Sequence, residues 1–170
     1  TNYMAWGADE RMTHLSPLAF DASTFEIWGS LLNGARLDIL PPGPFSVETL
    51  ARVLRQERTT ILWLTTTLFH TLVEEDSACL ASVRYILTGG EVTSGAKMAA
   101  VLRQHPSLKV VHCYGPTEST TFATTETFRS GDVVEDPPPL GRPIANTQVY
   151  ILDERLQVAL ADGREWLAAQ

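Results

Sequence analysis

The sequence predicts an α/β fold in which a mostly parallel sheet carries helices on both faces. Short apolar runs alternate with longer segments of helical periodicity along the chain up to about residue 120. The connections between these segments are short, which is typical of repeated strand–helix units in a parallel sheet. The 170 residues are enough for one domain, or for one domain and part of another.

The first strand is predicted at residues 13–18 and the first helix at residues 21–32. Apolar side chains recur in this helix at i, i+3 and i+7, at Phe25, Trp28 and Leu32. The pair Asn33–Gly34 then provides the residues that commonly end a helix.

The second strand is predicted at residues 36–40, and the proline-rich stretch 41–44 ends it. Ser46 can cap the following helix, and Glu48 lies in its first turn, where a carboxylate is favourable. The apolar stripe of this helix consists of Val47, Leu50, Ala51 and Leu54.

Three more strands are predicted at residues 60–64, 84–87 and 109–113, with helices at 66–75 and 94–104 between them. This makes about five strands up to Cys113. The regular alternation of strand and helix favours a doubly wound, flavodoxin-like sheet.

The pattern changes after Thr120. The sequence then predicts a Thr-rich strand, an acidic proline-rich loop, another strand and a short helix-like tail, at residues 121–128, 130–140, 148–152 and from Asp162. We therefore expect a flavodoxin-like subdomain over residues 1–130, followed over residues 131–170 by a linker and an incomplete β-rich segment.

Composition narrows the class of partner. The net charge of −7 and the pI of about 5.0 disfavour nucleic acid or an anionic membrane as the main partner. No apolar run reaches the roughly 18 residues that a membrane span needs. Two cysteines, without metal-ligand spacing, fit a reducing, cytoplasmic setting. The chain begins at Thr1 without an initiator Met or a signal-peptide pattern, so we expect it to be a piece of a longer polypeptide.

Three polar segments follow or flank predicted strand ends: residues 20–23, 87–91 and 114–118. Because the carboxyl ends of parallel strands lie on one edge of the sheet, we expect the last two segments to face one crevice, and Asp21 can face it too. Gly89–Gly90 would allow a flat ligand to approach the backbone closely. Taken alone, residues 114–118 are more typical of a surface turn whose Thr and Ser residues cap the next element.

Together these segments resemble a known family. FDASTFEIWGSLLNGARLDILP (20–41), YILTGGE (85–91), HCYGPTEST (112–120) and LGRPIANTQVYILDERLQ (140–157) are similar to the adenylation domain of nonribosomal peptide synthetases, within the adenylate-forming superfamily. The resemblance extends over nearly the whole chain up to about Val158. It implies activation of an amino acid with ATP and Mg²⁺, and transfer of the acyl group to the phosphopantetheine thiol of a peptidyl carrier domain.

The resemblance implies that one side of the crevice binds the nucleotide and the metal ion. Tyr114 resembles the ring that stacks on adenine, Thr117 a phosphate contact and Glu118 the magnesium ligand, a role that suits a hard oxygen donor. The remaining implied nucleotide contacts are Gly89, Gly90, Glu91, His112 and Gly115. His112 stands where relatives often have Asn, so its own contact to adenine is an open question. Thr117 and Glu118 are also the implied catalytic residues.

The resemblance also assigns an amino-acid pocket. Asp21 matches the carboxylate that binds the substrate α-amino group, which agrees with the need of a buried ammonium for a charged partner. The implied pocket wall consists of Ala22, Phe25, Trp63, Leu87, Gly89, Cys113, Thr121 and Phe122. This set is uncharged and resembles those of valine-activating domains, with other small branched side chains next in order. The alternatives are a helix N-cap for Asp21 and plain core packing for Phe25 and Trp63.

The resemblance further implies that other parts of such a domain are missing from this chain, including a phosphate-binding loop and a C-terminal subdomain with a lysine. We therefore expect the 170-residue chain to have little or no adenylation activity by itself and to work with the rest of an adenylation domain. Two alternatives stay open: an acyl- or aryl-acid ligase of the same superfamily, which would not need an acid at Asp21, and a non-catalytic flavodoxin-like interaction module.

Overall fold

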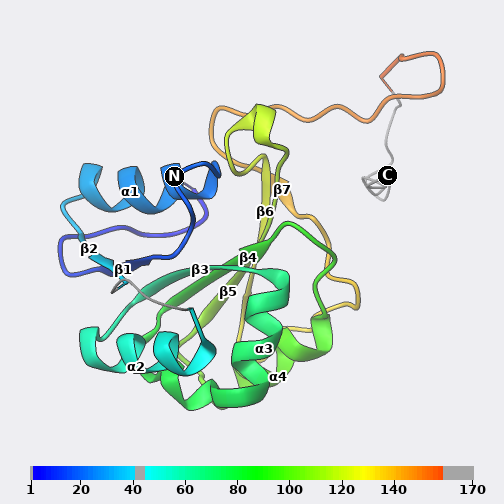
Figure 1. Ribbon diagram of the computed structural model, residues 1–170. Coiled ribbons are helices and arrows are strands. Elements are labelled where there is room, and N and C mark those ends of the chain that lie inside the picture. The colour runs from blue at the N-terminus through cyan, green and yellow to red at the C-terminus, as the bar shows by residue number, and fades with distance from the viewer. Residues whose placement is uncertain (1, 41–44, 159–170) are drawn as a thin grey trace.

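The computed structural model describes residues 2–40 and 45–158. The predicted proline turn at 41–44 and the helix-like tail from Asp162 lie outside these residues. In chain order the regular elements are β1 (Arg11–His14), α1 (Ala22–Leu32), β2 (Arg36–Ile39), α2 (Val47–Glu57), β3 (Ile61–Thr65), α3 (Thr66–Asp76), η1 (Ser77–Ser82), β4 (Tyr85–Gly89), α4 (Gly95–Gln104), β5 (Lys109–Tyr114), η2 (Thr117–Ser119), β6 (Thr124–Arg129) and β7 (Arg142–Pro143) (Figure 1).

The strands form one seven-stranded sheet in the order β2-β1-β3-β4-β5-β6-β7. The pairs from β2 to β5 are parallel, whereas β6 and β7 run antiparallel. In register, Thr65 lies opposite Gly89, which in turn lies opposite Cys113, so the ends of three central strands are level. The predicted mostly parallel α/β sheet, with five strands up to Cys113, is confirmed.

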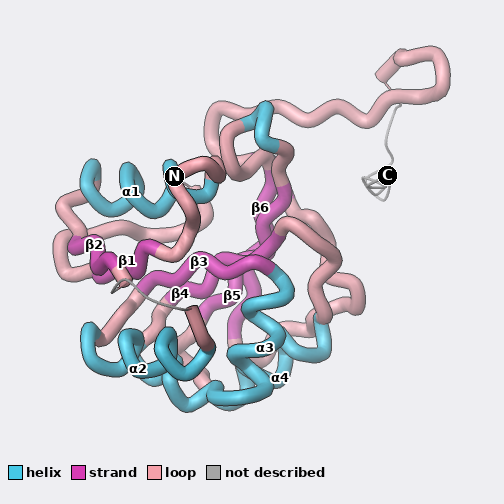
Figure 2. Tube along the Cα trace, viewed as in Figure 1, coloured by secondary structure: helices cyan, strands magenta, loops and turns pink. Residues whose placement is uncertain are grey.

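Helices cover both faces of this sheet (Figure 2). Each face has its own hydrophobic core. On one face α2, α3 and α4 pack through Leu50, Phe69 and Met98 against Leu62 and Val110 of the sheet. On the other face lie α1 and the N-terminal segment, and the cluster there is rich in aromatic rings. The predicted coverage of both faces is thus confirmed as well.

Local chemistry sets the helix ends. The hydroxyls of Ser46, Thr65 and Ser94 each accept a hydrogen bond from a backbone N–H three residues later, and thereby cap α2, α3 and α4. At the other end of α1, Asn33 is followed by Gly34 with φ +71°, a left-handed conformation that glycine adopts without steric cost. The predicted Ser46 cap and the predicted end of α1 are confirmed.

Two predictions in the first strand–helix unit are wrong. Of the predicted apolar row on α1, only Phe25 is buried, because Trp28 is 54% and Leu32 is 76% exposed. The helix instead buries Glu26, whose carboxylate accepts hydrogen bonds from the backbone N–H groups of Leu15 and Ser16. These two residues follow β1, so the first strand ends at His14 and not at residue 18.

Two predictions after Thr120 also need correction. The strand predicted from residue 121 begins only at Thr124, because the backbone of Thr120 and Thr121 is left-handed and cannot pair in a sheet. Residues 148–152 form no strand and contribute only an isolated bridge, between Leu152 and Val158. The short β7 joins the main sheet instead. A domain boundary near residue 130 stays a prediction.

No helix within residues 2–40 and 45–158 is both long enough and apolar enough to cross a bilayer.

Candidate functional site

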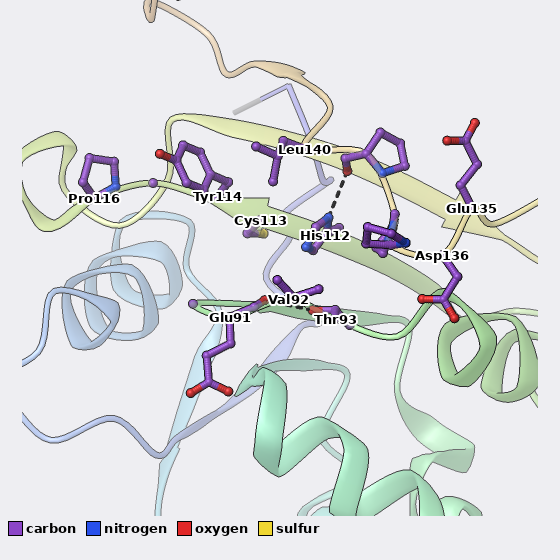
Figure 3. Close-up of a pocket in the computed structure, with 15 residues that line it drawn as sticks. Glu91, Val92, Thr93, His112, Cys113, Tyr114, Pro116, Glu135, Asp136 and Leu140 are labelled. Atoms are coloured by element: carbon purple, nitrogen blue, oxygen red, sulfur yellow. Dashed lines mark hydrogen bonds between the residues drawn. The ribbon is translucent and has the colours of Figure 1, made fainter. Parts of the chain in front are cut away.

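A cavity of about 790 Å³ opens at the carboxyl ends of β4 and β5, where the sequence predicts a crevice. It is lined by Gly90, Glu91, Val92, Thr93, His112, Cys113, Tyr114, Gly115, Pro116, Glu135, Asp136, Pro137, Pro138, Pro139 and Leu140. Figure 3 shows Glu91, Val92 and Thr93 on one side, and His112, Tyr114 and Leu140 on the other. Of the seven residues predicted to bind nucleotide, Gly90, Glu91, His112, Tyr114 and Gly115 line this cavity.

Gly89 and Thr117 are absent from the cavity wall, and for Gly89 the reason is packing. A Cβ atom at position 89 would lie 2.0 Å from the carbonyl oxygen of Cys113. Gly89 therefore lets β4 and β5 lie close together and does not itself make room for a ligand. The neighbouring Gly90 has φ +92° and lines the cavity, so the backbone turns there as only glycine does easily.

His112 is the most constrained polar side chain of the cavity. It is 4% exposed, and its Nδ1 lies 2.9 Å from the carbonyl oxygen of Pro139, so Nδ1 carries the proton and donates it (Figure 3). Burial lowers the pKa of His112, which favours the neutral ring. In that form Nε2 has a lone pair, and it has no hydrogen-bond partner among the described residues. A residue that lines the cavity thus carries a free hydrogen-bond acceptor.

The segment 135–140, which we call the strap, closes one side of the cavity. Asp136 accepts a hydrogen bond through Oδ1 from the backbone N–H of Gly95 at the start of α4, over 3.1 Å. A Cβ atom on Gly95 would lie 1.9 Å from the carbonyl oxygen of Glu135, so the strap rests directly on the helix backbone. Sequence reasoning predicted a loop here but missed its role as a wall, because proline and acidic composition does not reveal where a loop packs.

Most residues predicted to form the amino-acid pocket lie next to the cavity, on the sheet face covered by α1. Ala22, Phe25, Trp63, Leu87, Cys113 and Phe122 belong to one buried cluster. The ring of Phe122 lies 5.1 Å from that of Phe25 and 5.2 Å from that of Trp63, between ring centroids. Cys113 contributes to both places, because it is buried in this cluster and also lines the cavity.

Two further aromatic residues belong to this cluster and were missed. Tyr3 packs edge-on against Phe122, at 5.9 Å between centroids, and Trp6 packs against Phe25 at 5.7 Å. Burial raises the pKa of the Tyr3 hydroxyl well above its usual range. No sequence pattern connects residues 3 and 6 with residues 25 and 122, so only the tertiary structure could identify them.

Asp21 and Thr121 are joined directly. A carboxylate oxygen of Asp21 accepts a hydrogen bond from the backbone N–H of Thr121 at 3.1 Å, and the Thr121 hydroxyl donates to the carbonyl oxygen of Asp21 at 3.0 Å. Asp21 precedes α1, but its side chain makes no capping hydrogen bond to the helix. Its carboxylate therefore points toward the end of the sheet, at the rim of the aromatic cluster.

Glu118 lies in η2, and its side chain is exposed. Within the described residues, no three His, Cys, Asp or Glu side chains gather closely enough to hold a metal ion by themselves. A single exposed carboxylate is nevertheless a sufficient protein ligand for Mg²⁺ when substrate phosphates and water supply the other oxygens.

Similarity to known proteins agrees with this arrangement. A family described as AMP-binding enzyme matches residues 1–165. The chain is 41% identical to Surfactin synthase subunit 1 of Bacillus subtilis over 157 residues, and 39% identical to Bacitracin synthase 3 of Bacillus licheniformis over 155 residues. These matches cover 90% and 91% of this chain but only 4% and 2% of those proteins.

The chain is also similar to solved structures of adenylation proteins. An NRPS protein containing adenylation and PCP domains, bound to a vinylsulfonamide inhibitor, superposes with a TM-score of 0.88 at 39% identity, over 94% of this chain and 28% of that one. The N-terminal subdomain of Klebsiella oxytoca NpsA, in complex with 3-hydroxybenzoyl-AMSN, superposes with a TM-score of 0.81 at 26% identity, over 92% and 40% of the two chains.

Proposed function

The chain belongs to the AMP-binding enzyme family, and on this premise we propose that it is the substrate-binding core of an amino-acid adenylation domain of a nonribosomal peptide synthetase. One observation carries the proposal: the Asp21 carboxylate lies at the rim of an uncharged aromatic cluster, and this cluster adjoins the 790 Å³ cavity, since Cys113 belongs to both. An amino acid and a nucleotide would thus meet at one end of the sheet. The similarity to surfactin and bacitracin synthases supports this assignment.

The cavity is the proposed ATP site. Tyr114, which lines it, is 37% exposed, so its side chain is partly accessible for stacking on a base. The backbone from Gly90 to Glu91 forms the opposite wall, with Gly115 at the turn. At the base, the Nε2 lone pair of neutral His112 would accept a hydrogen bond from the 6-amino group of adenine, and it would not suit the 6-oxo group of guanine.

Glu118 is the proposed Mg²⁺ ligand, and Thr117 beside it the proposed phosphate contact. When bound, the ion would offset charge that develops on the phosphate oxygens. Both residues lie in η2, directly between the cavity residue Pro116 and the Thr120–Thr121 corner, so the phosphates would extend from the cavity toward Asp21. Gly89 supports this region through the close packing of β4 and β5.

The aromatic cluster is the proposed amino-acid side-chain site. Asp21 would pair with the α-ammonium group, and the wall of Ala22, Phe25, Trp63, Leu87, Cys113, Thr121 and Phe122 carries no charge. Such a wall favours a small aliphatic side chain, and we propose valine as the first choice. One methylene contributes only about 1–3 kcal/mol to discrimination, so isoleucine and leucine are the nearest competitors.

In the proposed reaction the carboxylate of the amino acid attacks the α-phosphorus of ATP, the P–O bond to pyrophosphate breaks, and an aminoacyl adenylate forms. The contribution of this chain is positioning: Asp21 fixes the amine, Tyr114 and His112 fix the base, and the two substrates are held in line with little freedom. The acyl group would then pass to the phosphopantetheine thiol of a carrier domain. Solved NRPS proteins that contain both adenylation and PCP domains support a carrier partner.

An aryl-acid ligase is the second candidate, because one similar structure holds 3-hydroxybenzoyl-AMSN, which carries an aryl acyl group. The two candidates differ at Asp21, because an aryl acid without an amine needs no carboxylate there. Titrations of the chain with L-valine and with 3-hydroxybenzoate, each with ATP and Mg²⁺ present, separate them by NMR. Shifts at Asp21 and Phe122 that appear with valine and not with 3-hydroxybenzoate support the proposal. Shifts there that appear with 3-hydroxybenzoate and not with valine support the second candidate.

The same titration tests the site as a whole. Addition of ATP should shift the resonances of His112, Tyr114 and Gly90, which line the cavity. Resonances on α2, for example Arg52, provide the internal control, because this helix packs on the opposite face of the sheet. Shifts confined to residues outside the cavity and the aromatic cluster would indicate an interaction module instead.

A further inference from the structure

The corner formed by Thr120 and Thr121 has an unusual backbone. Both residues have positive φ angles, 58° and 78°, and both are β-branched. Residues of this type rarely adopt the left-handed region, because the branched side chain crowds its own backbone. Two consecutive examples persist only where surrounding contacts hold them, and such corners concentrate at functional sites.

Local backbone hydrogen bonds, from Thr120 N–H to the carbonyl oxygen of Thr117 and from Phe122 N–H to that of Thr120, close this corner. Its long-range hydrogen bonds come from Asp21, 100 residues earlier in the chain. The backbone N–H of Thr121 donates to Oδ2 of Asp21, and the Thr121 hydroxyl donates to the carbonyl oxygen of the same residue. A third contact is steric: a Cβ atom on Gly115 would lie 2.7 Å from the carbonyl oxygen of Thr121. The hydroxyl of Thr121 is thus engaged with Asp21, while the residue keeps its place in the proposed pocket wall.

The same contacts determine the direction of the Asp21 carboxylate. An aspartate before a helix normally turns its carboxylate onto the first backbone N–H groups of that helix. Asp21 has helical backbone angles, φ −59° and ψ −28°, and makes no such bond. Its Oδ2 is held by Thr121, and Oδ1 has no hydrogen-bond partner within the described residues. One oxygen is therefore fixed and the other is available.

From this arrangement we infer that Thr121 is a positioning residue, which orients the Asp21 carboxylate so that its second oxygen can receive the ammonium group of an amino-acid substrate. The inference rests on the proposed function, because it requires an amine at Asp21. It adds a device to that function: a strained corner, stabilised by two hydrogen bonds, that fixes the amine-binding group before the ligand arrives. Preorganisation of this kind lowers the entropic cost of binding.

The test compares two ligands that differ only in the amine, L-valine and 3-methylbutanoate, on the full 170-residue chain. Thr121→Val removes the hydroxyl and keeps the branched shape, whereas Thr121→Ser keeps the hydroxyl. Thr71→Val is the matched control, because the Thr71 hydroxyl also donates to a backbone carbonyl, that of Thr67, on the exposed side of α3. Circular dichroism establishes that each variant is folded, and NMR titration gives the affinities.

We expect Thr121→Val to weaken valine binding by about tenfold, the effect of losing one hydrogen bond that holds the corner. Binding of 3-methylbutanoate should stay unchanged, because valine keeps the branched shape of the side chain. Thr121→Ser and Thr71→Val should bind both ligands as the wild-type chain does. Equal losses for the two ligands, or no loss for valine, would overturn the inference while leaving the amino-acid site in place. Failure of the wild-type chain to bind either ligand would overturn the amino-acid site, and the inference with it.

Discussion

The imidazole of His112 donates a hydrogen bond from Nδ1 to the carbonyl oxygen of Pro139, across 2.9 Å, and so connects β5 with the strap. This contact fixes the tautomer of a ring that is almost fully buried at the base of the cavity. Since the carbonyl can only accept, Nε2 of the neutral ring carries the lone pair and is the nitrogen left to accept a hydrogen bond. The consequences can be measured.

The first prediction concerns pH. Burial lowers the pKa of His112 below 6.5, so the ring is neutral at pH 7 and Nε2 accepts. Adenosine, which has no phosphate to titrate, should bind with constant affinity from about pH 8 to 7 and more weakly as the pH falls through the lowered pKa. Calorimetric titration measures this. Inosine, with a 6-oxo group, should bind more weakly at every pH.

His112→Asn is the control for this experiment. The carboxylates of Glu91, Glu135 and Asp136 line the same cavity and stay unchanged in the variant, so the difference between the two pH profiles isolates the contribution of His112. The lowered pKa also affects stability. The folded chain binds fewer protons at His112 than the unfolded chain, so this contribution is complete above about pH 6.5 and is lost as the pH falls. A pH-independent adenosine affinity in the wild-type chain would contradict the assignment of His112.

The second prediction concerns Asp21. Asp21→Asn should weaken the binding of L-valine by roughly 10- to 100-fold, because a charge-assisted hydrogen bond contributes about 1.5–3 kcal/mol. Adenosine binding should not change, since Asp21 does not line the cavity. Asp9→Asn removes an exposed carboxylate elsewhere in the chain and serves as the control. Unchanged valine affinity in Asp21→Asn would favour an acid substrate without an amine.

The third prediction concerns the packing of β4 on β5. Gly89→Ala should destabilise the chain by about 3 kcal/mol or more, because the new Cβ would collide with the backbone of Cys113 and neither central strand can move away. Gly7→Ala is the matched control, since no atom lies within 4 Å of its added Cβ. Urea unfolding compares the two variants. Equal free energies of unfolding would show that the strands can separate at little cost.

The fourth prediction concerns the start of α2. Ser46→Ala should lower the free energy of unfolding by about 1 kcal/mol, the usual effect of losing an N-cap hydroxyl. Ser107→Ala, at an exposed turn position, should change it by less than about 0.5 kcal/mol. Thermal unfolding measures both. A Ser46 variant as stable as the control would show that the hydroxyl contributes little to the stability of α2.

Much of the fold could be predicted because its signals are local. Ser46 before α2, the Asn33–Gly34 end of α1 and the apolar runs of β3, β4 and β5 each depend on neighbouring residues only. The row of Trp28 and Leu32 on α1 misled the prediction for the same reason: helical periodicity identifies an apolar face but does not say whether anything covers it. The buried Glu26 runs against composition and becomes reasonable only with its hydrogen-bond donors in place.

The candidate site likewise depends partly on local sequence and partly on long-range contacts. The sequence by itself determined the order of strands and helices, the polar strand ends at residues 87–91 and 114–118, and the residues available for chemistry. Only the tertiary structure decided that Thr121 holds Asp21, that the strap closes the cavity over His112, and that Tyr3 and Trp6 complete the aromatic cluster. The physical reason is separation along the chain: contacts between residues 100 positions apart follow no local period, and they form only when the sheet brings its strand ends to one edge.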